Sequence, residues 1–339
     1  MQPGGVCFVL NERFSMDKKR YSYSAYGLNI MSDIELPDLV NSVTECDVDI
    51  SFKQFSKADM DASLRGAVRF DRPGCVVRVA ERITGYSWQG IADVLIRNGN
   101  EVIISTAPGV DDNDMAPFIT GAILGNLLDQ RGFLVLHGSA IATSGNGIAF
   151  LGEKGAGKST FAAHMQKHGF PLITDDLIPV SFADGGITTL PGFPRIRLWG
   201  DSLDSVGADP ATSPKINKFV DKRSFHCGEN FAIEPVTVDA IYVLTLDDDV
   251  SIELLKPSEA FIELTRNTYL NRYLHASGKH SDNFRGCEMI VRSVPIFRLR
   301  RPHDFDRLPE VASAVMDHIA QPQRHSSVRH ARSSPGVLD

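Results

Sequence analysis

The sequence predicts an α/β fold, in which a small β-rich N-terminal domain precedes a larger domain with helices and a mixed sheet. Three observations support this prediction. Short apolar runs between turn formers fill the chain up to about residue 110. The glycine-rich stretch FLGEKGAGKST, residues 150–160, lies between an apolar run and a helical pattern. The apolar runs 133–143 and 147–152 are joined by a tight turn, which indicates an antiparallel pair in the second sheet.

The composition is that of a globular protein without a strongly basic surface. The 339 residues are 42% hydrophobic, which is enough for one large or two modest domains. The formal net charge of -7 argues against general binding to nucleic acids or anionic membranes, and no apolar run approaches the length of a membrane span. We therefore expect a cytoplasmic protein. Neither a zinc site nor a disulfide framework is indicated by the isolated cysteines Cys7, Cys46, Cys75, Cys227 and Cys287.

The domain boundaries are predicted from changes in composition. The segment 108–117, PGVDDNDMAP, is acidic and rich in proline and glycine, which is typical of a linker. We therefore assign residues 1–112 to the β-rich domain and residues 113–321 to the larger domain. The polar ending, 322–339, lacks apolar periodicity and is predicted to be a disordered tail.

The strands of the first domain are predicted where β-rich residues run between turn formers. Asn98 and Gly99 separate two such runs and predict a hairpin turn. The predicted strands lie within residues 22–39, 46–52, 75–80 and 92–106.

The second domain is predicted to open with a helix at 117–132. This helix has a proline in its first turn and two small residues, Gly121 and Gly125, on one side. A later strand, at 170–182, is interrupted by two adjacent carboxylates. The remaining predictions are a buried strand at 238–246 and helices at 257–274 and 308–320.

The glycine-rich stretch matches the pattern G-x-x-x-x-G-K-[ST] of a phosphate-binding loop. Its glycines let backbone N–H groups turn toward phosphates, the lysine reaches the β and γ oxygens, and the hydroxyl binds Mg²⁺. The alternative is a coincidental glycine turn. The flanking strand and helix favour a nucleotide site, because the helix N-terminus then faces the phosphates. The candidate nucleotide-binding residues are Gly152, Lys154, Gly155, Ala156, Gly157, Lys158, Ser159 and Thr160.

Two neighbouring carboxylates, Asp175 and Asp176, follow an apolar strand. Near a triphosphate, one such carboxylate can hold Mg²⁺ while the other accepts a proton from an attacking hydroxyl, which would make the protein a kinase. The alternative is a solvated turn. His137 ends another apolar run, where a lone histidine is more often structural than catalytic.

Residues 136–176, from LHGSAIATSGNG to FPLITDD, resemble the core of the HPr kinase/phosphorylase family. His137 lies 21 residues before Lys158, and Asp175 lies 17 residues after it, as the family's catalytic histidine and aspartate do. The resemblance implies an ATP-binding catalytic domain related to phosphoenolpyruvate carboxykinases. It also implies that Asp175 accepts the serine proton, that His137 holds or tunes this carboxylate, and that Ser159 and Asp176 place Mg²⁺.

The resemblance is not uniform along the chain. The family carries a glutamate-containing segment, associated with phosphorylase activity, where this chain has LPGFPRIRLWGDSL at 190–203 without a glutamate. The flanks, 26–39 and 294–311, are similar to HPr-kinase-like proteins encoded beside lasso peptide biosynthesis genes. Members of that group phosphorylate a serine hydroxyl near the C-terminus of a precursor peptide.

Four basic residues are further candidates for contacts to phosphate or to an acceptor. Two arginines at i and i+2 share one face of an extended segment, and a lysine and an arginine follow a proline-rich loop. The alternative for each is a solvated surface residue. The basic run 298–304, RLRRPHD, is interpreted as a locally paired surface. The four candidates are Arg195, Arg197, Lys222 and Arg223.

The predicted function is ATP-dependent transfer of phosphate to a serine hydroxyl of a peptide or small protein, of the lasso precursor type. The cofactors are ATP and Mg²⁺, and neither nucleic acid nor membrane is expected as a partner. The resemblance leaves the oligomeric state open and allows a homo-oligomer, since HPr kinases form hexamers. The alternatives are a bifunctional HPr kinase/phosphorylase in carbon regulation, a non-catalytic nucleotide-dependent binding module, and a kinase with a small-molecule acceptor.

Overall fold

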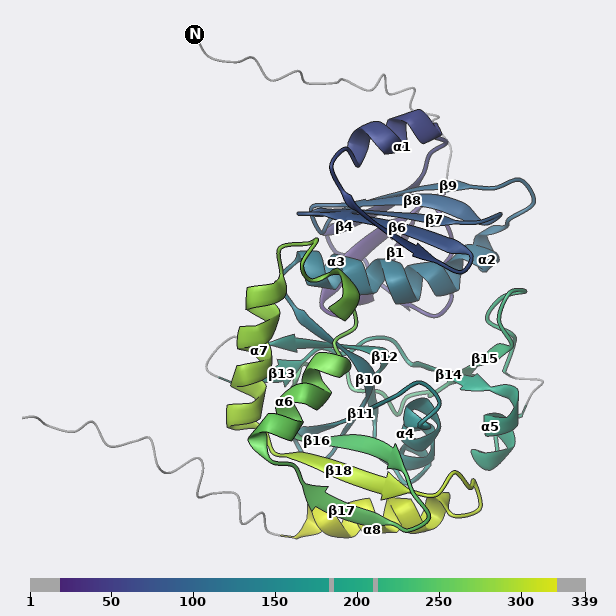
Figure 1. Ribbon diagram of the computed structural model, residues 1–339. Helices are drawn as coiled ribbons and strands as arrows, with labels where there is room; N and C mark the ends of the chain where they lie inside the picture. The colour runs from purple at the N-terminus through teal and green to yellow at the C-terminus, as the bar shows by residue number, and fades with distance from the viewer. Residues whose placement is uncertain (1–18, 183–185, 210–212, 322–339) are drawn as a thin grey trace, which may run out of the picture.

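The computed structural model describes residues 19–182, 186–209 and 213–321 (Figure 1). Within these ranges the chain forms a nine-stranded, a seven-stranded and a two-stranded sheet, and the predicted α/β class with a mixed sheet is confirmed. The nine-stranded sheet lies at the top of Figure 1, and the seven-stranded sheet lies below it. The predicted tail, 322–339, and residues 1–18 with Cys7 lie outside the described residues.

The nine-stranded sheet is formed by the β-rich part of the sequence. Its order is β3-β1-β2-β4-β9-β8-β7-β6-β5, and only the pairs of β4 with β2 and β9 are parallel within this sheet as described. Asn98 and Gly99 have φ angles of 53° and 69°, which confirms the predicted turn between β8 and β9. The strands are β1 (Tyr21–Ala25), β2 (Leu28–Ser32), β3 (Val40–Asn41), β4 (Val48–Phe52), β5 (Val68–Arg72), β6 (Cys75–Ala80), β7 (Ile83–Trp88), β8 (Ala92–Arg97) and β9 (Glu101–Thr106).

The segment predicted to be a linker begins a helix instead. Asp111 and Asp114 form a capping box, in which each side chain accepts a hydrogen bond from the other residue's backbone N–H. Pro117 lies inside the helix, so the prediction that it occupies the first turn was wrong. The capping residues outweigh the local proline and glycine content. Three consecutive elements follow the cap, namely α2 (Asp112–Phe118), the π-helical turn η1 (Ile119–Ile123) and α3 (Leu124–Gln130).

This helical layer shares an apolar core with the nine-stranded sheet. Met115 and Leu127 are fully buried in one cluster with Ile50 of β4. The opposite face of the sheet is covered by α1 (Lys57–Ser63), which packs Met60 against β8 and β9 (Figure 1). The domain boundary after residue 112 stays a prediction.

The seven-stranded sheet holds the glycine-rich sequence. Its order is β11-β10-β12-β13-β16-β18-β17, and β11 also pairs with β16, so five of its strands close into a ring. The β10–β11 pair is antiparallel, as the tight turn predicted, whereas β11–β16 and β16–β18 are parallel. The strands are β10 (Leu134–Ala142), β11 (Gly147–Gly152), β12 (Leu172–Ser181), β13 (Thr188–Thr189), β16 (Val236–Leu246), β17 (Ser251–Leu254) and β18 (Ile296–Arg301).

Helices cover both faces of this sheet. Helices α4 and α8 pack on one apolar cluster of the sheet, while α6 and α7 pack on another (Figure 1). The helix predicted at 257–274 was too long, because α6 ends at Arg266 and a short 3-10 turn follows. Within the described ranges, no helix is long and apolar enough to cross a membrane. The remaining elements are α4 (Lys158–Lys167), α5 (Gly200–Ser205), α6 (Pro257–Arg266), η3 (Asn271–Tyr273), α7 (His280–Ser293), α8 (Leu308–Ala320) and the two-stranded sheet of β14 (Arg195–Trp199) and β15 (Lys222–His226).

Candidate active site

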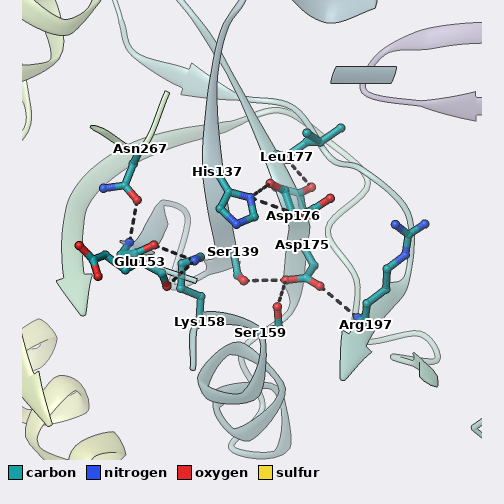
Figure 2. Close-up of polar contacts among 12 residues, drawn as sticks. His137, Ser139, Glu153, Lys158, Ser159, Asp175, Asp176, Leu177, Arg197 and Asn267 are labelled. Atoms are coloured by element: carbon teal, nitrogen blue, oxygen red, sulfur yellow. Dashed lines mark hydrogen bonds and ion pairs between the residues drawn. The ribbon is translucent and has the colours of Figure 1, made fainter. Parts of the chain in front are cut away.

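The candidate active site lies where β10, β11 and β12 meet the N-terminus of α4 (Figure 2). Residues 152–159, called the glycine-rich loop below, lead from the buried strand β11 into α4, so the predicted order of strand, loop and helix is confirmed. Gly152, Gly155 and Gly157 have φ angles of 141°, 91° and 87°. Side chains with a Cβ rarely adopt such angles, so this loop conformation requires glycine at these positions.

Lys158 folds back over the glycine-rich loop. Its Nζ donates hydrogen bonds to the carbonyl oxygens of Gly152, at 2.7 Å, and Glu153, at 3.1 Å (Figure 2). Only 7% of the residue is exposed. Burial lowers the pKa of Lys158, and the charges of Asp175 and Asp176 oppose this shift. The ammonium group is therefore held at the loop by neutral carbonyls, close to two acids.

Asp175 is the inner carboxylate of the site and is 6% exposed. Its Oδ1 accepts hydrogen bonds from the hydroxyls of Ser139, at 2.6 Å, and Ser159, at 2.8 Å. Its Oδ2 accepts the backbone N–H of Arg197 at 3.1 Å. These donors come from β10, α4 and β14, so Asp175 links three elements around the glycine-rich loop (Figure 2).

Asp176 is the outer carboxylate, with 29% of its side chain exposed. Nδ1 of His137 lies 3.2 Å from Asp176 Oδ1 and 3.1 Å from the Asp176 carbonyl oxygen. Both partners are acceptors, so Nδ1 of His137 is the donor in both contacts. The resemblance implied that His137 tunes Asp175. The contacts instead join His137 to Asp176.

Two features distinguish Asp176, namely the low pKa of its carboxyl group and the unusual angle of its backbone. Burial by itself would raise the pKa of Asp176, but the hydrogen bond and charge of His137, followed by the charges of Arg197 and Lys222, lower it to about 2. The backbone of Asp176 has a φ angle of 74°, which is strained for a residue with a side chain. Strand β12 nevertheless continues past both acids, to Ser181. The sequence predicted that the acids interrupt this strand, but the structure shows only a local change of backbone angle at Asp176.

The helical layer covers the outer side of the site at its π-helical turn. A Cβ added to Gly121 would lie 3.7 Å from Asp176 Oδ2 and 3.6 Å from Arg197 Nη1. Arg197 donates to the Thr120 hydroxyl, and its buried Nε has no hydrogen-bond partner in the described part of the chain. Tyr269 lies beside His137, with ring centroids 5.9 Å apart, and burial raises the pKa of its hydroxyl strongly. We call Asp176, His137, Arg197 and this helical turn the outer side of the site.

Asn267 ties the two sides together. Its side-chain oxygen accepts the N–H of Gly152 at 3.0 Å, and its carbonyl accepts the N–H of His137 at 2.7 Å. The start of the glycine-rich loop and the histidine strand are thus held by one residue at the end of α6 (Figure 2).

Three of the other predicted contact residues have partners other than the two acids. Arg195 pairs with Asp38 at 3.4 Å, and Arg223 donates to the Ser213 carbonyl. Lys222 lies over the Trp199 ring, 5.3 Å from its centroid, although its charge still contributes to the low pKa of Asp176. Within the predicted nucleotide-binding set, Lys154 and Gly155 are exposed, while Ala156 and Thr160 are buried.

Four residues of the site were not predicted. Ser139 lies two residues after His137 on the same strand face, so the period of a strand could have identified it. The contacts of Thr120, Asn267 and Tyr269 come from tertiary packing and have no local sequence signal.

Comparisons with known proteins support the family resemblance. No family model matches the chain. HPr kinase/phosphorylases from two Clostridium botulinum strains, Eklund 17B and Alaska E43, are each 41% identical over 72 residues, covering 21% of this chain and 23% of the relative. The Clostridium beijerinckii HPr kinase/phosphorylase is 44% identical over 50 residues, covering 15% of this chain and 17% of the relative. The matched segments thus span less than a quarter of these relatives.

A solved structure, the Hpr(Ser) kinase/phosphatase from Coxiella burnetii, matches with a TM-score of 0.31 at 12% identity, covering 55% of this chain and 95% of that chain. At that TM-score the overall likeness is weak, so the family resemblance rests on the sequence relatives.

The fold and site define a mixed α/β protein with a glycine-rich loop between strand and helix and two acids on a neighbouring strand. Within this class, segments of 50 to 72 residues of the chain are similar to HPr kinase/phosphorylases.

Proposed function

We propose that the protein is an ATP-dependent kinase that transfers the γ-phosphate to a serine hydroxyl of a peptide or small protein. One observation carries the proposal: Ser159 of the glycine-rich loop donates to Asp175, Lys158 of the same loop feels the charges of both acids, and His137 pairs with Asp176. Phosphoryl transfer depends mainly on alignment and on neutralising charge, and this arrangement provides groups for both. The sequence relatives are HPr kinase/phosphorylases, which agrees with this proposal.

The residues present fit ATP and Mg²⁺. The positive φ angles of Gly155 and Gly157 let backbone N–H groups of the loop turn toward phosphate, and Lys158 can exchange its carbonyl partners for phosphate oxygens. Mg²⁺ prefers hard oxygen ligands and needs only one or two protein groups beside the phosphates, which Ser159 and a neighbouring acid would supply. Bound Mg²⁺ would neutralise charge on the phosphates.

The two acids then divide the work. The resemblance gave proton transfer to Asp175 and metal placement to Asp176, but the contacts favour the reverse. Asp175 already binds the metal-side hydroxyl of Ser159 and has three donors around it. Asp176 is more exposed and has His137 beside it. We therefore propose that Asp175 supports the metal side and that Asp176, beside His137, receives the serine proton.

The proposed transfer forms one bond, breaks one bond and moves one proton. The serine oxygen forms a bond to the γ-phosphorus while the bond from that phosphorus to the bridging oxygen of the leaving ADP breaks. The hydroxyl proton passes to the carboxylate of Asp176, which the contact with His137 holds in place. The Arg197 guanidinium, close to Asp176, offsets the negative charge that gathers there.

The acceptor is proposed to be a lasso-type precursor peptide. This part rests on the similarity of segments 26–39 and 294–311 to the lasso-associated proteins. A bifunctional kinase/phosphorylase is the second candidate, because the sequence relatives carry that name. The missing glutamate in 190–203 weighs against it.

Mass spectrometry tests the proposal. A lasso precursor peptide and HPr are each incubated with Mg-ATP and wild type, Asp176→Asn or the surface control Asp71→Asn, which lies on the distant strand β5. A gain of one phosphate on a peptide serine, retained by the control and lost in Asp176→Asn, supports the proposal. Modification of HPr together with its reversal by inorganic phosphate would favour the bifunctional candidate. No phosphorylation of either acceptor would contradict a peptide or protein kinase.

A further inference from the structure

The three arginines of the run 298–304 have different environments. Arg298 pairs with Glu263 at 3.8 Å, and Arg300 pairs with Asp247 at 3.1 Å, as expected for a paired surface. Arg301 does not fit that interpretation, because it is only 2% exposed. It is the bulkiest fully buried side chain of the described residues.

Arg301 points from the end of β18 toward the glycine-rich loop. Phe297 and Leu299, four and two residues earlier on the same face, pack in the apolar cluster that contains α4. Arg301 is next in this row, and its Nη1 lies 3.5 Å from the carbonyl oxygen of Ala156. A Cβ at Gly157 would overlap Nη1 of Arg301, so a larger residue at this position would require the guanidinium to move.

The buried charge of Arg301 has no carboxylate partner in the described part of the chain. Its hydrogen bonds go to two backbone carbonyls, those of Pro302, at 2.9 Å from Nε, and Ala156. Burial lowers its pKa, with no acid nearby to oppose the shift. A guanidinium stays protonated in proteins, and a buried charge without an opposite charge is unfavourable. A ligand of opposite charge at the loop would relieve this cost.

The contact with Ala156 also has a directional consequence. In a trans peptide, the carbonyl of Ala156 and the N–H of Gly157 point in opposite directions. Arg301 attracts the carbonyl to its own side and thereby turns the Gly157 N–H to the other side. Gly157 precedes the first residue of α4, where N–H groups bind phosphate.

We propose that Arg301 is a nucleotide-positioning residue, which holds the Ala156–Gly157 peptide in its phosphate-binding orientation and supplies a fixed positive charge behind the loop. This inference rests on the proposed nucleotide-dependent function. Arg301 acts through the loop backbone and has no contact of its own with the reacting atoms. The charge, which is unfavourable without an opposite charge nearby, becomes favourable once phosphates bind.

The test compares nucleotide affinity with stability. Wild type, Arg301→Gln, Arg301→Lys and the matched control Arg300→Gln are titrated with Mg-ATP and Mg-ADP by calorimetry, and the unfolding temperature without nucleotide is measured for each. We expect Arg301→Gln to bind ATP about tenfold more weakly, with a smaller loss for ADP, because one fixed charge is removed near the phosphates. Its unfolding temperature without nucleotide should be equal or higher, since a buried unpaired charge is gone. The control should bind as wild type does.

The outcomes separate the inference from the function on which it rests. Unchanged ATP affinity in a folded Arg301→Gln variant overturns the inference alone. Equal losses for both nucleotides with a lower unfolding temperature point to a purely structural role and also overturn it. If Arg301→Gln does not fold, Arg301→Lys decides, because lysine keeps the charge but lacks the planar fork. A loss of threefold or more then supports the inference, and a smaller loss overturns it. A wild type that binds neither nucleotide overturns the proposed function as well.

Discussion

The two sides of the candidate active site hold their acids in different ways. Asp175, beside the glycine-rich loop, is 6% exposed and accepts hydrogen bonds from two hydroxyls and one backbone N–H. Asp176, on the outer side, has a side chain that is 29% exposed and contacts His137. The backbone of Asp176 itself is strained, with a φ angle of 74°. The two acids contact different residues on the same face of β10: Asp175 contacts Ser139, and Asp176, with this φ angle, contacts His137. Neighbouring acids with such different partners are suited to separate tasks.

The largest expected effect is that of Asp176→Asn on the rate. Removal of the proton acceptor should lower kcat for serine phosphorylation by about 10²–10⁴-fold, while the Kd for Mg-ATP stays within about threefold of wild type. Steady-state kinetics and calorimetry with the precursor peptide measure both quantities. If Asp175→Asn has the larger effect on kcat and Asp176→Asn changes mainly the Mg²⁺ requirement, the roles follow the original resemblance instead.

The second effect is that of Asp175→Asn on metal use. Loss of the carboxylate that binds Ser159 should raise the Mg²⁺ concentration needed for half-maximal rate by about 10- to 100-fold, as for residues that support metal ligands. Rate measurements at saturating ATP over a range of Mg²⁺ give this value, with Asp71→Asn as the surface control. An unchanged Mg²⁺ requirement would remove Asp175 from the metal side.

A third effect concerns packing above the outer side. A methyl group at Gly125 would lie 2.6 Å from the Tyr269 ring, whereas at Gly121 the nearest atom would be 3.6 Å away. Gly125→Ala should therefore lower the free energy of unfolding by about 2 kcal/mol. The matched variant Gly121→Ala has room for its methyl group and should be neutral or slightly stabilising. Chemical denaturation measures both, and equal stability of the two variants would contradict the described packing.

The smallest effect is the pH dependence that Asp176 adds to stability. Its pKa is lowered from 3.8 to about 2 in the folded protein, so the ionised form favours folding. This contribution is complete above about pH 4 and is lost as the pH falls through 2. The difference in unfolding free energy between wild type and Asp176→Asn should shrink by about 1–2 kcal/mol over that interval, after allowance for solvent screening. A difference that is constant with pH would show that His137 does not stabilise the charge.

The two sides also differ in how well the sequence predicts them. Local sequence determines the glycine-rich loop, because its glycine angles and its strand and helix all follow from neighbouring residues. The outer side depends on partners from distant parts of the chain, such as Thr120 and Tyr269, whose contacts arise only from tertiary packing. Family spacing pointed to both acids and implied that His137 tunes Asp175, whereas the contact of His137 is with Asp176. Spacing along a strand does not say which side chain a neighbouring strand meets.

At the level of the fold, the sequence predicted the mixed α/β class but missed several boundaries. The capping box of Asp111 and Asp114 is visible in the sequence, yet it lies in a segment whose proline and glycine content is typical of a linker. The end of α6 has no such signal. Closure of the strand ring depends on the pairing of β11 with β16, which are far apart in the chain and which no local pattern joins.

That ring has a mechanical consequence for the glycine-rich loop. Strand β11, which leads into the loop, has a hydrogen-bonded neighbour on each side, β10 and β16, and all of its residues are buried. Its amide hydrogens should be among the slowest in the protein to exchange with solvent, since exposing them requires the ring to open. The glycine-rich loop is thus anchored to a rigid strand. Any movement that brings a nucleotide and an acceptor together should therefore occur in the segments outside the ring.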